Sequence, residues 1–178
     1  RRQTGEIAEL ARSLDLPTFS RRPAAGRWSV AEHLAHLCNT LGPYLDAMET
    51  AVERGRRRGW RPGGGELRET WMGRKFHALL EPPPRRRVKT FGAMQPPGVE
   101  AIERGAVLDE FGRCQERLRG ILEDGEEVDL GRARIASPFV PLLRFIRFPV
   151  HQSVGHMAAH NDRHLWLMRE TLDQLDGA

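Results

Sequence analysis

The chain has 178 residues, of which 39% are hydrophobic and 29% are charged, and its formal net charge is +4. This length and composition suit one globular domain over residues 1–178 and exclude a disordered chain, and so small a surplus of positive charge does not by itself indicate nucleic-acid binding. No apolar run approaches the roughly 18 residues of a membrane span, and no signal peptide is visible, so we expect a cytoplasmic protein without a membrane partner.

The first predicted element is a short helix over residues 3–14. Ile7, Leu10 and Leu14 recur within it at helical spacing. Pro17 and the polar stretch 20–26 are expected to end it, because proline and glycine interrupt a helical pattern.

The second predicted element is a long helix that begins after Ser29. Glu32 stands three residues after Ser29, which is the spacing of a capping box. Apolar residues then fall on one helical face as far as about residue 53, and Pro43 is expected to kink the helix or remove one hydrogen bond. The residues of this face are Val30, Leu34, Leu37, Leu41, Leu45 and Met48.

The middle of the chain alternates between loops and helices. Residues 54–65 are rich in arginine and glycine and predict a loop, and residues 66–80 predict a short helix. Three consecutive prolines end that helix, and a loop runs to Gly98. Residues 99–123 predict a further helix, which Gly125 ends.

The last predicted element is a long helix opened by Pro138 and Pro141. Its apolar stripe runs from Leu142 to Leu175, with Pro149 as a kink near its start. No strand pattern competes anywhere in the chain. The prediction is therefore an all-α fold, a four-helix bundle with a long connection between its second and third principal helices.

The two cysteines, Cys38 and Cys114, lie 76 positions apart, within apolar helical patterns. This placement predicts buried free thiols rather than a disulfide.

Five of the seven histidines lie in two short clusters. The C-terminal cluster places His156, His160 and His164 four residues apart, so that neighbouring imidazoles share one helical face. Two imidazoles at this spacing can bind one metal ion, although the same pattern also arises by chance at the edge of a core. A third ligand from another helix would make the indication strong.

The N-terminal cluster contains His33 and His36, and the pattern does not decide between them. On a helical wheel His33 lies closer to the centre of the apolar stripe. His36 lies further round and would face a neighbouring helix only if that helix packs on that flank.

Both clusters lie in segments that resemble the DinB-like superfamily. Residues 28–37 read Trp-Ser-Val-Ala-Glu-His-Leu-Ala-His-Leu, similar to that family's W-S-x-x-E-x-L-x-H-L signature. Residues 160–165 read His-Asn-Asp-Arg-His-Leu, similar to its terminal H-x-x-R-H-L stretch. The chain departs from the family where a glutamine often follows the last histidine, since residues 166–168 are Trp-Leu-Met.

The resemblance implies a four-helix bundle with a divalent metal ion held by His36, His160 and His164. His33 and His156 are then neighbours of the site or ordinary residues at the edge of the core. Glu32, Asn39, Asn161 and Asp162 lie close enough in the sequence to orient the ligands, but for each we favour surface solvation or helix capping. Three neutral imidazoles leave a position open for water or substrate, as in catalytic sites. Zn²⁺ is the expected ion, and imidazole also suits Ni²⁺ and Fe²⁺.

The reactions that the resemblance implies are hydrolysis and transfer of a low-molecular-weight thiol to an electrophilic small molecule. Both follow from the lowered pKa of a water or thiol at a metal ion. One alternative is a non-catalytic bundle in which the metal only braces the helices. Another, which we favour less, is nucleic-acid binding through the arginine-rich loops at residues 54–61 and 85–87. A homodimer through an exposed helix face is also expected.

Overall fold

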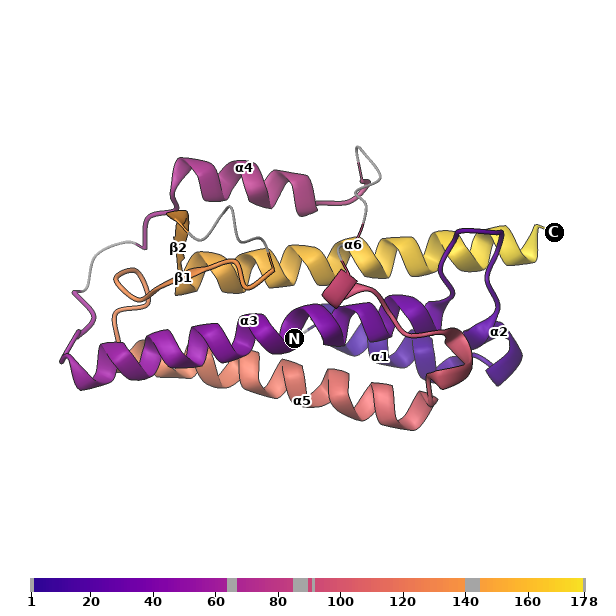
Figure 1. Cartoon of the computed structure of the whole chain (residues 1–178), viewed down its shortest axis with the longest axis horizontal. Coiled ribbons are helices and arrows are strands. Elements are labelled where there is room, and N and C mark those ends of the chain that lie inside the picture. Colours follow the sequence, from indigo (N-terminus) through magenta and orange to yellow (C-terminus); the bar gives the residue numbers. More distant parts are fainter. Residues whose placement is uncertain (1, 64–66, 85–89, 91, 140–144, 178) are drawn as a thin grey trace.

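Four long helices lie side by side along the molecule (Figure 1). The computed structural model describes residues 2–63, 67–84, 90, 92–139 and 145–177. The long helices are α1 (Arg2–Ser13), α3 (Val30–Arg57), α5 (Arg104–Glu123) and α6 (Val150–Asp176). The predicted all-α bundle is confirmed, and the long connection between its second and third principal helices runs from residue 58 to residue 103.

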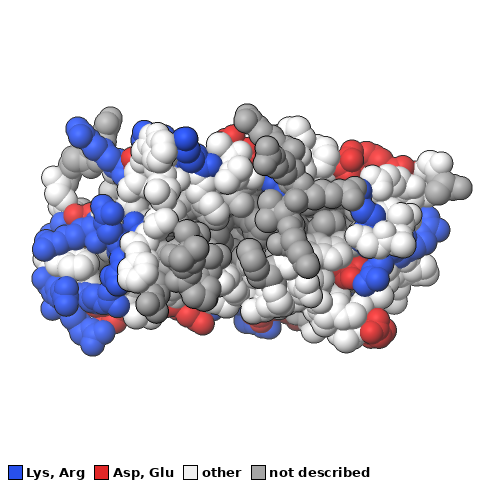
Figure 2. Space-filling view, turned by 45° about the horizontal axis from the view of Figure 1, so that its top comes forward, with Lys and Arg blue, Asp and Glu red and all other residues white. Residues whose placement is uncertain are grey.

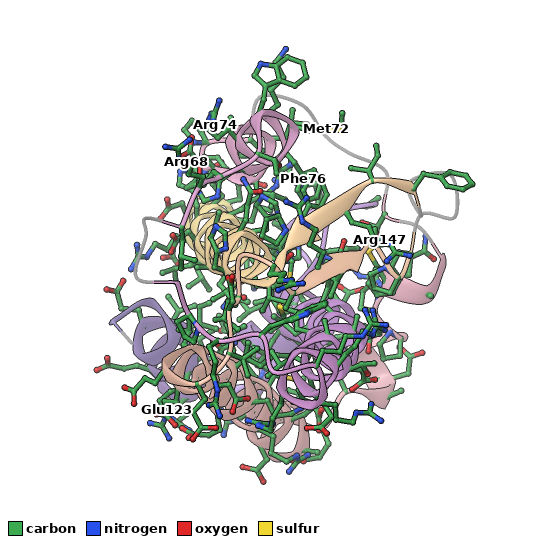
Figure 3. The ribbon with its side chains drawn as sticks, turned by 90° about the vertical axis from the view of Figure 1, so that its left-hand side faces the viewer. Arg68, Met72, Arg74, Phe76, Glu123 and Arg147 are labelled. Atoms are coloured by element: carbon green, nitrogen blue, oxygen red, sulfur yellow. The ribbon has the colours of Figure 1, made fainter. Side chains whose placement is uncertain are left out.

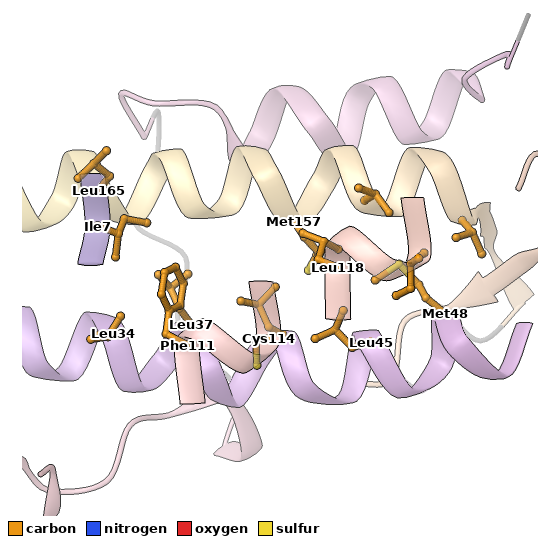
Figure 4. Close-up of a cluster of buried hydrophobic side chains, with 14 of the residues drawn as sticks. Ile7, Leu34, Leu37, Leu45, Met48, Phe111, Cys114, Leu118, Met157 and Leu165 are labelled. Atoms are coloured by element: carbon orange, nitrogen blue, oxygen red, sulfur yellow. The ribbon is translucent and has the colours of Figure 1, made fainter. Parts of the chain in front are cut away.

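The core lies where the apolar faces of these helices meet (Figure 4). The predicted stripe of α3 is buried along its whole length, since one face of a 28-residue helix packs against α5 on one flank and α6 on the other. Partners of that stripe include Phe111, Cys114, Leu118 and Ile121 of α5, and Met157, Leu165 and Met168 of α6.

Both cysteines are free, as predicted. Cys114 is buried and Cys38 is half-buried. Burial raises the pKa of Cys38 to about 12 and that of Cys114 to about 11, so neither thiol is a reactive nucleophile near neutral pH.

Helix α3 begins at the predicted residue but ends later than the sequence predicted. It runs without a break through Pro43 and continues to Arg57, four residues beyond the predicted end. Arg54, Arg56 and Arg57 are therefore in its last turn and not in a loop. Basic side chains are favourable there, because they lie at the negative end of the helix dipole.

Two short helices differ from the prediction at their boundaries. Helix α2 (Leu16–Ser20) forms where a break was expected, because Asp15 accepts a hydrogen bond from the Thr18 amide and Pro17 lies in the first turn, where its missing N–H costs nothing. Helix α4 (Trp71–Leu80) begins at the Thr70 cap, later than predicted.

The predicted helix over residues 99–123 is divided. Residues Val99–Ala101 form a 3-10 turn, η2, and α5 begins only at Arg104, where the Glu103 side chain caps it. Two further 3-10 turns are η1 (Gly92–Met94) and η3 (Asp124–Glu126).

The start of the last helix was predicted wrongly. Helix α6 begins at Val150, and a two-stranded antiparallel sheet precedes it, with β1 (Arg134–Ala136) paired to β2 (Arg147–Pro149). Pro149, expected as a kink, ends β2 and caps α6. A proline lacks the N–H that a helix passing through it would need. Residues 140–144, including Pro141 and Leu142, lie outside the described residues.

Helix α4 packs on the outer side of α6. Gln152 of α6 accepts hydrogen bonds from the amide and hydroxyl of Thr70, and its own amide group donates to the Thr70 carbonyl. Phe76 points from α4 towards α6 and β2, where it contacts Phe148 and His156, as the end-on view shows (Figure 3). The His156 Nε2–H donates to the Gly73 carbonyl at 3.0 Å.

Basic side chains gather at the end of the molecule where α3 ends (Figure 2). Two of these arginines form ion pairs within the protein. Arg56 pairs with Glu53, Asp124 and Glu127, and Arg57 pairs with Glu53. The second predicted run, residues 85–87, lies outside the described residues. Within the described part of the chain, no helix has the length and apolar character needed to span a membrane.

Candidate metal centre

The first turn of α3 is fixed by a buried network around Glu32. The Ser29 hydroxyl accepts from the Glu32 amide, and the Glu32 carboxylate accepts from the Ser29 amide at 3.0 Å, which completes the predicted capping box. Arg22 also donates to this carboxylate. Burial alone would raise the pKa of Glu32, but the hydrogen bonds from Arg22 and Ser29 outweigh it and lower the pKa. The hydrogen bonds of the Glu32 carboxylate thereby fix the start of the helix that carries His33 and His36.

Three histidines from two helices meet beyond this turn. His36 comes from α3, and His160 and His164 come from successive turns of α6. One ligand nitrogen of each lies within 4.8 Å of the others. The ring centroids of His36 and His164 are 4.6 Å apart, as are those of His160 and His164. The structure thus brings together the three histidines that the resemblance singled out.

The three imidazoles are buried, with exposed fractions of 4% for His36, 9% for His160 and 5% for His164. Burial lowers the pKa of all three, to about 3 for His160, because the charged form loses its hydration. All three are therefore neutral at pH 7, and a neutral imidazole has the free lone pair that a metal ligand needs.

A backbone carbonyl sets the tautomer of His36. Its Nδ1 lies 2.6 Å from the carbonyl oxygen of Met94, in η1, and a carbonyl can only accept. The proton of His36 is therefore on Nδ1, and the lone pair on Nε2 faces His160. A metal-binding histidine typically donates the N–H of its other ring nitrogen to a carbonyl or carboxylate in this way.

The spacing of one pair of ligand nitrogens matches the spacing at a tetrahedral divalent ion. The Nε2 atoms of His36 and His160 are 3.4 Å apart, beyond the usual hydrogen-bond range. Two nitrogens bound at about 2.0–2.1 Å to a tetrahedral ion lie about 3.3–3.4 Å apart. The donor set, three imidazoles, suits Zn²⁺, Ni²⁺ or Fe²⁺. The Nδ1 atom of His160 is buried and has no hydrogen-bond partner among the described residues.

Sequence reasoning left open which of His33 and His36 faces inward, and both do. His33 is 6% exposed, and its Nδ1 lies 3.0 Å from the Nδ1 of His164. The stripe of α3 is wide enough to bury both residues: His33 lies against His164, and His36 lies against His160 and His164. His156, the other predicted neighbour, is directed to α4 instead.

Three of the four residues named from sequence proximity as orienting groups form hydrogen bonds away from the three histidines. Glu32 bonds Ser29 and Arg22, Asn39 donates to the Gln95 carbonyl, and Asn161 donates to Gln115. Met94 was not predicted, because no local pattern marks a carbonyl 58 positions from the histidine it contacts.

The Trp28 ring packs against the histidines of the centre. Its ring centroid lies 5.0 Å from that of His36 and 6.3 Å from that of His164. It also lines a cavity of about 270 Å³, together with Arg22, Glu32 and residues 95–98.

Comparison with known proteins agrees with the geometry of the centre. Neither the curated proteins nor the solved structures contained a match to this chain. A family model described as the DinB superfamily matches residues 1–168, which include α1, α3, α5, most of α6 and all three histidines. The chain therefore belongs to the DinB superfamily.

Proposed function

We propose that the protein is a divalent-metal-dependent enzyme that transfers a low-molecular-weight thiol to an electrophilic small molecule or hydrolyses a small-molecule substrate. The observation that carries the proposal is the convergence of three neutral imidazoles, from two helices, on one point. Among the described residues, these three histidines are the only cluster of histidine, cysteine or carboxylate side chains that could hold a metal ion. With three protein ligands, one coordination position of the ion would remain open for a reactant.

His36, His160 and His164 would hold the ion, with Zn²⁺ as the expected metal. A bound divalent ion lowers the pKa of a water or thiol and polarises an electrophile. The Met94 carbonyl keeps the Nε2 atom of His36 available, and burial keeps the three rings uncharged. Trp28 shields the centre from solvent, and the adjoining cavity would admit the reactant.

The metal site itself is tested by elemental analysis of purified protein, with anomalous scattering to locate the ion. We expect about one divalent ion per chain in the wild type and none in His36→Ala or His164→Ala. His151→Ala is the matched control, because His151 is also on α6 but its Nδ1 faces the Leu130 carbonyl. Wild-type protein that binds no divalent ion would refute the proposal.

A second function, a metal-braced bundle without catalysis, is favoured by the burial of the histidines. An ion bound by His36, His160 and His164 would cross-link α3 to α6 in a site that is at most 9% exposed. A panel of thiols with an electrophilic acceptor, and a panel of esters and amides, separates the two. Turnover that is lost in His164→Ala supports the enzyme, whereas metal-dependent melting without turnover supports the brace.

A further inference from the structure

His33 lies against the candidate metal centre without being one of its three histidines. It precedes His36 by three residues on α3, and its ring centroid is 5.2 Å from that of His164 and 5.3 Å from that of Trp28. Its Nδ1 and the Nδ1 of His164 are 3.0 Å apart, a hydrogen-bond distance. The proposed function assigns no role to this contact.

Only one of the two nitrogens in this contact can carry a proton, because two N–H groups cannot face each other at 3.0 Å. If His33 donates, His164 holds its proton on Nε2, and that nitrogen has no lone pair for an ion. If His164 donates from Nδ1, its Nε2 lone pair is free. The direction of this one hydrogen bond therefore decides whether Nε2 of His164 can be a ligand.

The contact of His36 with Met94 shows the same arrangement with a different acceptor. There a carbonyl, which cannot donate, fixes the proton on Nδ1. At His164 the partner is an imidazole, which can accept or donate. An ion at Nε2 would select the state in which His33 accepts and holds its own proton on Nε2.

We propose that His33 is a positioning residue, whose Nδ1 accepts the Nδ1–H of His164 and keeps the Nε2 lone pair of His164 directed at the metal. This inference rests on the proposed metal site. Outer acceptors of metal-bound histidines typically change metal affinity by about 10- to 100-fold. The role of His33 should therefore be visible in binding itself.

Two substitutions separate hydrogen-bond acceptance from packing. In His33→Asn the Oδ1 atom is two bonds from Cβ, as Nδ1 is in histidine, so an acceptor remains at nearly the same place. In His33→Leu a side chain of similar bulk has no acceptor. His33→Phe is a second variant without an acceptor, in case the leucine variant does not fold.

The test measures Co²⁺ affinity by chelator competition, the Co²⁺ absorption spectrum, and the His164 tautomer by ¹⁵N NMR of zinc-loaded protein. We expect His33→Asn to bind Co²⁺ within a few-fold of wild type. His33→Leu or His33→Phe should bind about 10- to 100-fold more weakly, with the spectrum, and hence the ligand number, unchanged. The NMR spectrum of the wild type should show the His164 proton on Nδ1.

Three results would overturn the inference, and they differ from one another. Equal affinity in all variants would leave His33 with a packing role only. Loss of a ligand from the spectrum in both the asparagine and leucine variants would make His33 itself a ligand. Wild-type protein that binds no Co²⁺ or Zn²⁺ would remove the metal site, and with it the proposed function as well as this inference.

Discussion

At the scale of single residues, the centre depends on imidazoles that are buried and uncharged. Burial lowers the pKa of His33 and of His160 to about 3, and it lowers the pKa of His36 and His164 too. The same burial that keeps a lone pair available for a metal makes protonation costly. Without a bound ion, the protonation of these four rings at low pH should destabilise the folded protein.

We therefore expect the free energy of unfolding of metal-free protein to fall as the pH drops from about 7.5 to 5. In the unfolded chain these histidines take up protons near their ordinary pKa of 6.5, whereas His33 and His160 in the folded protein do so only near 3. Between pH 6.5 and pH 3 the unfolded state therefore binds more protons than the folded state. The free energy of unfolding is highest above pH 6.5 and decreases as the pH falls below that value. Each such histidine contributes about 1.4 kcal/mol per pH unit once the pH is well below 6.5.

Urea unfolding at pH 7.5, 6.0 and 5.0 in the presence of a chelator measures this loss. His160→Gln removes one titrating group and should show a shallower decline. A free energy of unfolding that does not change between pH 7.5 and 5.0 would contradict the expected neutral histidines.

At the scale of elements, the start of α3 and the docking of α4 on α6 position the centre. The capping box at Ser29 fixes the turn that carries His33 and His36. Helix α4 precedes η1, whose Met94 carbonyl reaches His36, and Arg163 of α6 donates to the Leu79 carbonyl at the end of α4. The docking of α4 therefore holds the turn of α6 that carries Arg163 and His164.

Ser29→Ala should lower the free energy of unfolding by about 1–2 kcal/mol. The substitution removes the cap on the Glu32 amide and one donor to a buried carboxylate. Ser13→Ala is the control, because the Ser13 hydroxyl is exposed and donates only to the Leu10 carbonyl. Chemical denaturation compares the two, and an equal, small effect of both would show that the capping box adds little.

Gly73→Ala should destabilise the protein by about 1–3 kcal/mol. A Cβ at Gly73 would overlap the Gln152 side chain, which is buried and tied to Thr70 by three hydrogen bonds and cannot move without losing them. The matched control is Gly112→Ala on α5, where a Cβ meets nothing within 4 Å.

The control should be neutral or stabilising by up to about 1 kcal/mol, because alanine is the better helix former. Thermal melts of both variants test the close approach of α4 to α6. If Gly73→Ala melts at or above the wild-type temperature, α4 does not pack as tightly as the structure indicates.

At the scale of the whole molecule, the three histidines connect the N-terminal and C-terminal parts of the chain. His36 lies on α3, and His160 and His164 lie 124 and 128 positions later on α6. These two helices also share the core. An ion bound between them would stabilise the folded state alone, since the unfolded chain does not bring the three rings together.

Zn²⁺ at about 100 times its dissociation constant should therefore raise the free energy of unfolding by about 2.7 kcal/mol. For a chain of this size the gain corresponds to a rise in melting temperature of roughly 5–10 °C. Calorimetry with and without Zn²⁺ measures it. His151→Ala should show the same rise as wild type and His164→Ala should show none, whereas an equal rise in all three proteins would place the bound ion elsewhere.

The principal helices could be predicted from the sequence because their signals are local. A 3.6-residue period of apolar residues marked the core face of α3, and the spacing of Ser29 and Glu32 marked its first residue. The same period predicted that His160 and His164 share a face. The ends of the helices were predicted less well where contacts between distant segments compete with the local pattern. Residues Arg147–Pro149, which the sequence placed in the last helix, form β2 because they pair with β1.

By itself, the sequence determined a four-helix bundle and placed His160 and His164 on one face of the last helix. Both conclusions follow from the periodicity of residues along individual helices. Only the tertiary structure decided that His33 and His36 are both inside, with the Nδ1 of His33 against His164 and the Nε2 of His36 against His160. It also placed the Met94 carbonyl against His36. The physical reason is that a hydrogen bond between distant segments depends on which flanks of the helices meet, and that packing involves the whole core.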